Sequence, residues 1–131
     1  MLAQNLKTPA DLGMDKKFHS TLVQILGMLE RGELVHARAL DPIPNGFNMT
    51  QIRNESECGT VLCIAGWVNK LAHDAKAPGN PNSQHDLAYG RLIMPPGWSG
   101  SGHEITCDQG AIALRNYLTS GEARWEEVLA E

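Results

Sequence analysis

The residues best suited to chemistry lie in the stretch from Cys58 to Trp67, which has the sequence Cys-Gly-Thr-Val-Leu-Cys-Ile-Ala-Gly-Trp. No charged residue occurs from position 61 to position 68, and a helix that is apolar on every side is buried on every side. The pattern predicts a central buried helix over residues 60–76, with Cys58 just before its start. In the simplest interpretation, Cys58-Gly59-Thr60 is a tight helix start and Cys63 is a buried, inert thiol that packs as a small apolar side chain.

A second interpretation is a zinc site. Cys58, Cys63, His103 and Cys107 would give four soft ligands, which suits tetrahedral zinc. The spacing argues against it, because two cysteines five residues apart point to different sides of a helix, and the chain has no C-x-x-C pair. We therefore expect three reduced, metal-free cysteines and no cofactor.

A third interpretation is a cysteine nucleophile. Cys58 and Cys107 both lie near predicted helix starts, where backbone N–H groups and the helix dipole lower the pKa of a thiol. A cysteine-dependent enzyme also needs a base. The sequence offers five scattered histidines and does not show which one would approach: His19, His36, His73, His85 and His103. No family-specific catalytic pattern accompanies either cysteine.

Two irregular segments offer apolar side chains for binding. Residues 97–102 form a glycine-rich loop that carries Trp98, and residues 40–50 carry Phe47. Loops on a rigid scaffold often form recognition surfaces, and tryptophan is a frequent anchor. The glycine-rich loop has no preceding strand and no following Lys-Ser/Thr, which excludes a phosphate-binding loop. The alternative for Trp98 is that it folds back on the core.

The elements around these residues are mostly helical. Thr8-Pro9 and Asp15 are typical helix starts, the apolar residues from Phe18 to Leu29 follow a helical stripe, and Thr106 to Gln109 is a capping box. The sequence predicts a mainly α-helical bundle of four or five helices in a single domain over residues 1–131. Residues 1–14 are a candidate for a loosely packed segment. A long irregular segment over 33–57 has room for one short strand pair, and a final helix is expected from Glu122.

The signature C-G-T-x-x-C-I-A-G at residues 58–66 resembles that of an uncharacterised family of small bacterial and phage-associated proteins. The resemblance extends over about two-thirds of the chain, from Phe47-Asn48-Met49 through Ile105-Thr106 and 111–118 to Trp125. It implies a link to phages or mobile elements, and no activity, substrate or cofactor.

The charge balance bears on partners. The 11 basic and 15 acidic residues give a net charge of -4, without the basic surface that phosphate contacts require, so no nucleic-acid partner is expected. No apolar run approaches the roughly 20 residues of a membrane span, and no signal peptide is visible, which favours a cytoplasmic protein. We expect a small soluble binding protein with a protein partner; the alternatives are the cysteine-dependent enzyme and the zinc-binding domain.

Overall fold

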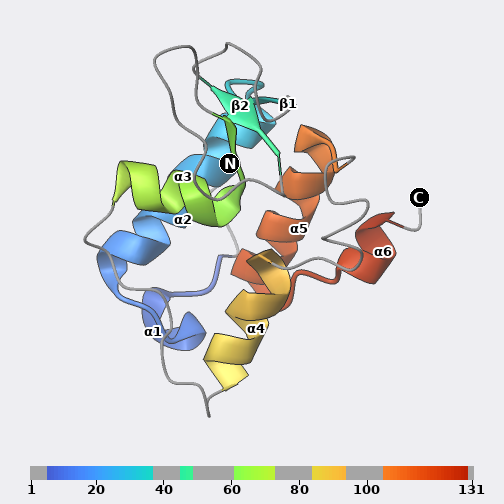
Figure 1. The fold of residues 1–131 in the computed structure, drawn as a ribbon. Helices are drawn as coiled ribbons and strands as arrows, with labels where there is room; N and C mark the ends of the chain where they lie inside the picture. The colour runs from blue at the N-terminus through green and yellow to red at the C-terminus, as the bar shows by residue number, and fades with distance from the viewer. Residues whose placement is uncertain (1–5, 37–44, 49–60, 73–83, 94–104, 130–131) are drawn as a thin grey trace.

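The computed structural model describes residues 6–36, 45–48, 61–72, 84–93 and 105–129, and these ranges form a mainly helical fold, as predicted (Figure 1). They contain six helices, against the four or five expected, and three strands of two residues each. In chain order these are α1 Pro9–Leu12, α2 Lys16–Glu30, β1 Val35–His36, β2 Gly46–Phe47, β3 Val61–Leu62, α3 Ile64–Leu71, α4 Gln84–Ile93, α5 Cys107–Ser120 and α6 Trp125–Leu129.

The helix starts that local signals predicted are present. Thr8 caps α1 in a capping box with Asp11, and the Asp15 carboxylate accepts the Phe18 N–H at 2.7 Å at the start of α2. A second capping box opens α5, where the Thr106 hydroxyl accepts the backbone N–H of Gln109 at 3.1 Å. Each cap satisfies a backbone donor that the first helical turn leaves free.

The N-terminal segment packs more tightly than expected. Leu12 and Met14 belong to the buried core, and the Lys7 N–H donates to the Leu118 carbonyl oxygen at 2.7 Å. The expectation of a loosely packed segment over 1–14 is therefore wrong from residue 6 onward, because apolar burial and a backbone hydrogen bond attach this segment to α5.

The irregular segment over 33–57 contains two paired strands, β1 and β2, which confirms the predicted strand pair. The three strands form a parallel sheet in the order β1-β2-β3, with Val35 opposite Gly46 and Gly46 opposite Val61. The third strand is a correction, because the sequence pattern placed residues 61 and 62 in a helix. Their backbone pairs with β2 instead, so the helix begins only at Ile64.

The helix after β3 is thus shorter than the predicted range 60–76. Its N-cap is Cys63, whose Sγ accepts the Gly66 N–H at 3.4 Å, and its last residue is Leu71. Ile64 and Trp67 are buried as predicted, whereas Leu71 is 38% exposed. The indole N–H of Trp67 donates to the Gly46 carbonyl oxygen at 2.9 Å and so fastens α3 to β2.

Helix α5 lies at the centre of the packing. It contacts α2, α4 and α6, while α3 packs against α2 (Figure 1). The last helix starts at Trp125 rather than at the predicted Glu122. Arg124 adopts a left-handed conformation with φ of 55°, and its carbonyl oxygen accepts the backbone N–H groups of Glu127 and Val128. In the described part of the chain, no helix combines the length and apolar character that crossing a membrane requires.

The contact between Phe47 and Gly110 predicts a large effect of one added methyl group. A Cβ at Gly110 would lie 2.7 Å from Cζ of the fully buried Phe47 ring. We expect Gly110→Ala to lower the free energy of unfolding by about 1–3 kcal/mol, because the enclosed ring must shift. The measurement is urea denaturation.

Gly90→Ala in α4 is the matched control, since a Cβ there meets nothing within 4 Å. It should be neutral or stabilise by up to about 1 kcal/mol, because alanine favours the helix. Equal destabilisation by both variants would contradict the role given to the Phe47 contact.

Candidate functional site

The Cys107 thiol is held in its neutral form. Its Sγ donates a hydrogen bond to the Leu34 carbonyl oxygen at 3.3 Å, and the side chain is half-buried. Burial raises the pKa of the Cys107 thiol, the neighbouring Asp108 carboxylate raises it further, and a hydrogen bond from the His36 backbone opposes both effects in part. The helix start therefore does not lower the pKa of this thiol, and that expectation from the sequence is wrong.

The other cysteine of the described ranges is buried. Cys63 is 1% exposed, and like Cys107 it is not part of a disulfide bond. The described residues contain no cluster of three or more His, Cys, Asp or Glu side chains that could hold a metal ion. Cys58 and His103 lie outside the described residues, so the zinc set and the Cys58 nucleophile both stay predictions.

The two proposed apolar anchors have different outcomes. Phe47 is 0% exposed and packs against Gly110, so the expectation of an exposed anchor at this position is corrected: its ring belongs to the core. The sequence pattern of a short strand around Phe47 was right, but it did not show which face of the strand is covered. Trp98 lies outside the described residues.

A groove runs between α4 and the connection from α5 to α6. Two adjoining cavities of about 270 and 500 Å³ share Ala88, Arg91 and Glu122, and together we name them the α4 groove. The smaller part is also lined by Ala123, Arg124, Trp125 and Glu126, and the larger part by Lys7, Asp11, Leu12, Tyr117, Ser120 and Gly121. The volume of the larger cavity, about 500 Å³, is typical of a small-ligand pocket, and that of the smaller cavity lies just below the usual range of roughly 300–1,000 Å³.

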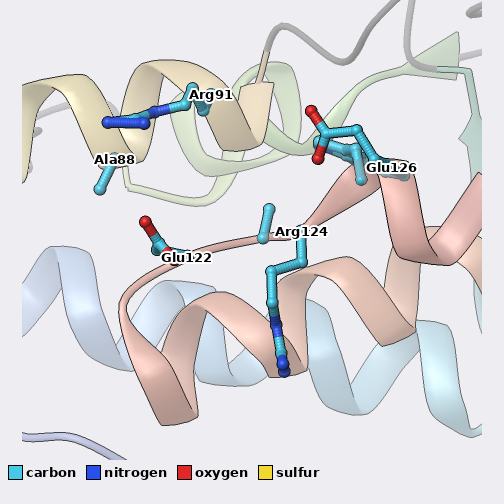
Figure 2. Close-up of a pocket in the computed structure, with 7 residues that line it drawn as sticks. Ala88, Arg91, Glu122, Arg124 and Glu126 are labelled. Carbon is cyan, nitrogen blue, oxygen red and sulfur yellow. The ribbon is translucent and has the colours of Figure 1, made fainter.

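Opposite charges face the groove from its two walls. Figure 2 shows the Arg91 guanidinium reaching over the groove from α4 and the Glu122 carboxylate rising from the connection below it. They do not form an ion pair with each other or with any other described residue, and the one hydrogen bond of the Arg91 side chain within the described ranges joins Nε to the Leu87 carbonyl oxygen at 3.4 Å. Among the described residues, the two charged groups therefore line the groove without neutralising each other.

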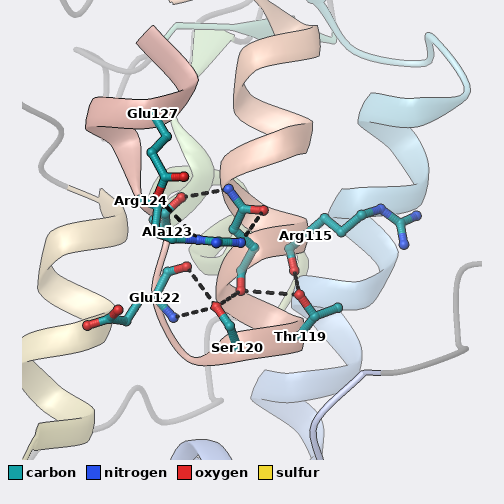
Figure 3. A network of polar contacts seen from close by, with 8 residues as sticks. Arg115, Thr119, Ser120, Glu122, Ala123, Arg124 and Glu127 are labelled. Atoms are coloured by element: carbon teal, nitrogen blue, oxygen red, sulfur yellow. Dashed lines mark hydrogen bonds and ion pairs between the residues drawn. The ribbon is translucent and has the colours of Figure 1, made fainter. Parts of the chain in front are cut away.

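The lower wall is fixed by polar contacts (Figure 3). The Asn116 side chain donates to the Ala123 carbonyl oxygen at 3.0 Å and accepts from Arg124 at 3.1 Å. The Ser120 hydroxyl donates to the Asn116 carbonyl oxygen at 2.7 Å and accepts the Glu122 N–H at 3.4 Å. These bonds hold the backbone that carries Glu122.

The upper and lower walls are joined at one end. The indole N–H of the buried Trp125 donates to the Leu92 carbonyl oxygen at 2.9 Å, across 33 residues of chain. A buried indole N–H without a partner is costly, so this bond fixes α6 relative to the last turn of α4. The hydrogen bond between Trp125 and Leu92 therefore holds the two walls together at this end of the groove.

A buried tyrosine lies beneath the larger part of the groove. Tyr117 is 0% exposed, and its hydroxyl has no hydrogen-bond partner among the described residues. Its ring lies 6.2 Å from that of Tyr89, which in turn makes an edge contact with Phe18 at 5.2 Å. Burial raises the pKa of both tyrosines, so both remain protonated hydrogen-bond donors.

The sequence pattern did not indicate the α4 groove. Arg91, Glu122 and Tyr117 come from three separate elements, and no spacing in the sequence connects them. The capping box at Thr106 and the glycine at position 121 mark the two ends of α5, but they do not show which residues of other elements lie beside it.

Comparisons of the chain with protein families, with curated proteins and with solved structures found no match.

The raised pKa of Cys107 predicts slow alkylation. At neutral pH we expect iodoacetamide to modify Cys107 more slowly than a free cysteine, because only the thiolate reacts and burial disfavours it. Peptide-level mass spectrometry over time measures the rate for each cysteine, with the urea-unfolded chain as the control. Asp108→Asn should increase the rate at Cys107. A folded protein in which Cys107 reacts faster than in urea would contradict this prediction.

The two buried tyrosines predict a cooperative alkaline transition. The chain has only Tyr89 and Tyr117, so tyrosinate absorbance reports on these two alone. In the folded protein the pKa of each tyrosine lies above the unfolded value of about 10, so burial of the protonated rings stabilises the fold. This stabilisation is complete below pH 10 and is lost as the pH rises above about 10. We expect tyrosinate to appear together with the loss of helical circular dichroism. Ionisation of either tyrosine near pH 10 in a fully helical protein would show that its hydroxyl is accessible.

Proposed function

We propose that the chain is a binding protein that holds a charged ligand in the α4 groove. The observation that carries this proposal is the pair of opposite charges, Arg91 and Glu122, on facing walls without an ion pair between them. A ligand that bears charge can contact such groups without first breaking an existing ion pair.

The rigidity of the groove supports the same proposal. The wall that carries Glu122 is fixed by Asn116 and Ser120, and Trp125 joins it to the end of α4. A site that is already formed before binding avoids the entropic cost of ordering its side chains and backbone. Most small-molecule sites are preformed in this way.

The enzyme alternative has less support in the described residues. Among the described residues, those that line the α4 groove include neither cysteine nor histidine, and the Cys107 thiol contacts Leu34 beside β1 instead. A nucleophilic cysteine needs a lowered pKa or an adjacent base. Cys58 as a nucleophile, and the zinc set that includes it, remain alternatives to be tested by the alkylation series and by elemental analysis.

A segment of a protein partner is the second candidate ligand. Leu87 is 55% exposed and lies one helical turn before Arg91 on α4, where it could anchor an apolar side chain beside the groove. The net charge of -4 supports a partner other than nucleic acid. A cytoplasmic location, a link to phages or mobile elements, and Trp98 as a further anchor belong to this proposal as predictions.

Amide chemical shifts of the groove residues report binding of any compound from a panel of charged probes. We expect singly charged carboxylates and amines, zwitterions and short peptides to shift the amide signals of Ala88, Gly121 and Ala123 in the ¹⁵N-labelled protein. The double variant Arg91→Gln/Glu122→Gln should lose these shifts, because it removes both unpaired charges. A matched control is Arg31→Gln/Glu33→Gln, which neutralises an exposed ion pair remote in sequence from the groove.

The same experiment separates the two candidates. A peptide whose binding is lost in Leu87→Asp, but not in Ile112→Asp on the exposed face of α5, identifies a protein segment as the ligand. If no compound shifts the groove amides, or if the control variant loses binding equally, the proposed function is wrong.

A further inference from the structure

We infer that the α4 groove binds a free amino acid, with the ligand's carboxylate at Arg91 and its ammonium group at Glu122. This inference rests on the proposed function and names its ligand class. It rests on three observations: the opposite charges of the two walls, the volume between them, and the lack of an ion pair for Arg91 or Glu122 among the described residues.

The upper wall provides the anion-binding group. The Arg91 side chain uses Nε for its hydrogen bond to Leu87, so no described residue occupies the two terminal nitrogens of the guanidinium. A guanidinium matches the geometry of a carboxylate and can bind it through two parallel hydrogen bonds. Lys7 adds a second positive charge in the larger part of the groove.

The lower wall provides the cation-binding group. Arg124 lies on the same wall but does not compete for Glu122, because its side chain runs away from the groove to Asn116 and Glu127 (Figure 2). The Glu126 carboxylate lies at the other end of this wall, and Figure 2 shows it on the groove side. An ammonium group would therefore meet negative charge on this wall.

The balance of charges selects a dipolar ligand. Positive and negative side chains both face the groove, namely Lys7 and Arg91 with Asp11, Glu122 and Glu126, whereas the guanidinium of the sixth charged lining residue, Arg124, points away from it. A simple anion would be attracted by one wall and repelled by the other, and the same holds for a simple cation. A zwitterion with opposite charges at its two ends gains from both walls.

The volume and the buried hydroxyl agree with a small zwitterion. The part of the groove that contains Arg91, Glu122 and Glu126 has about 270 Å³, which suits a molecule of amino-acid size rather than a polymer. Beneath the larger part, the Tyr117 hydroxyl has no acceptor among the described residues. That hydroxyl oxygen is itself buried, so a carboxylate oxygen or a water molecule would reach it only if the floor of the groove opened on binding.

The experiment uses blocked ligands against single variants. The proteinogenic L-amino acids are titrated one by one into the labelled protein, and the tightest binder is compared with its carboxamide and its N-acetyl derivative. In the native protein we expect each derivative to bind about tenfold more weakly or worse, because each lacks one charged contact. In Arg91→Gln the carboxamide should bind as well as the parent, and in Glu122→Gln the N-acetyl derivative should do so.

Both variants change exposed side chains, and their circular dichroism and urea midpoints confirm that they fold. The inference is overturned if no amino acid shifts the groove amides, if the blocked derivatives bind as well as the parent, or if trialanine binds and free amino acids do not. When singly charged compounds still bind in the groove, the proposed function stands and only the ligand class is wrong. When nothing binds there, both are wrong.

Discussion

The burial of α5 on three sides is the constraint on which the rest of the structure depends. Because α2, α4 and α6 all pack against it, most of the buried side chains of α5 are small or apolar, while Arg115 at the edge pairs with Glu30 of α2. Gly110 allows the Phe47 ring to approach the helix backbone, and Ala113 and Leu114 are completely buried. The sheet is therefore attached to α5 through Phe47, and α4 and α6 pack against the apolar face of α5. Tyr117 is the position at which this apolar burial leaves a polar group without a partner among the described residues.

The α4 groove is a consequence of the same arrangement. α4 and α6 rest on a common helix but are connected to it by different segments, so their facing surfaces meet at the Trp125 indole and the Leu92 carbonyl. Beyond that hydrogen bond the walls diverge and leave Arg91 and Glu122 on opposite sides. One wall is a packed helix and the other is a connection held by hydrogen bonds, and such fixed elements position a site more precisely than free loops do. The strained backbone of Arg124, at φ of 55°, is held within this wall, and such strain is commonly found near binding and active sites.

Local signals were enough to predict α1, α2 and α5 together with their first residues. The caps at Thr8, Asp15 and Thr106 act within three residues of chain, so the sequence alone contains the whole interaction. The strand β3 and the cap at Cys63 were missed, because a two-residue strand is stabilised by partners far along the chain and cysteine is not a usual cap. The groove residues were missed for a related reason: their proximity depends on how three helices pack, and none of them is unusual in its own segment. The burial of Phe47 depends in the same way on a glycine 63 positions later.

The contrast between Cys107 and the groove is the reason for proposing binding rather than cysteine chemistry. A nucleophile requires stabilisation of its charged form, and the environment of Cys107 does the opposite, since burial and Asp108 both disfavour the thiolate. In the groove, Arg91 and Glu122 are exposed to water and stand on separate segments of backbone. The Trp125 hydrogen bond and the Ser120 contacts hold the segments that carry Arg91 and Glu122, so under the proposed function a ligand would be selected by the separation of its own charges. Selectivity of this kind needs fixed walls and no covalent step.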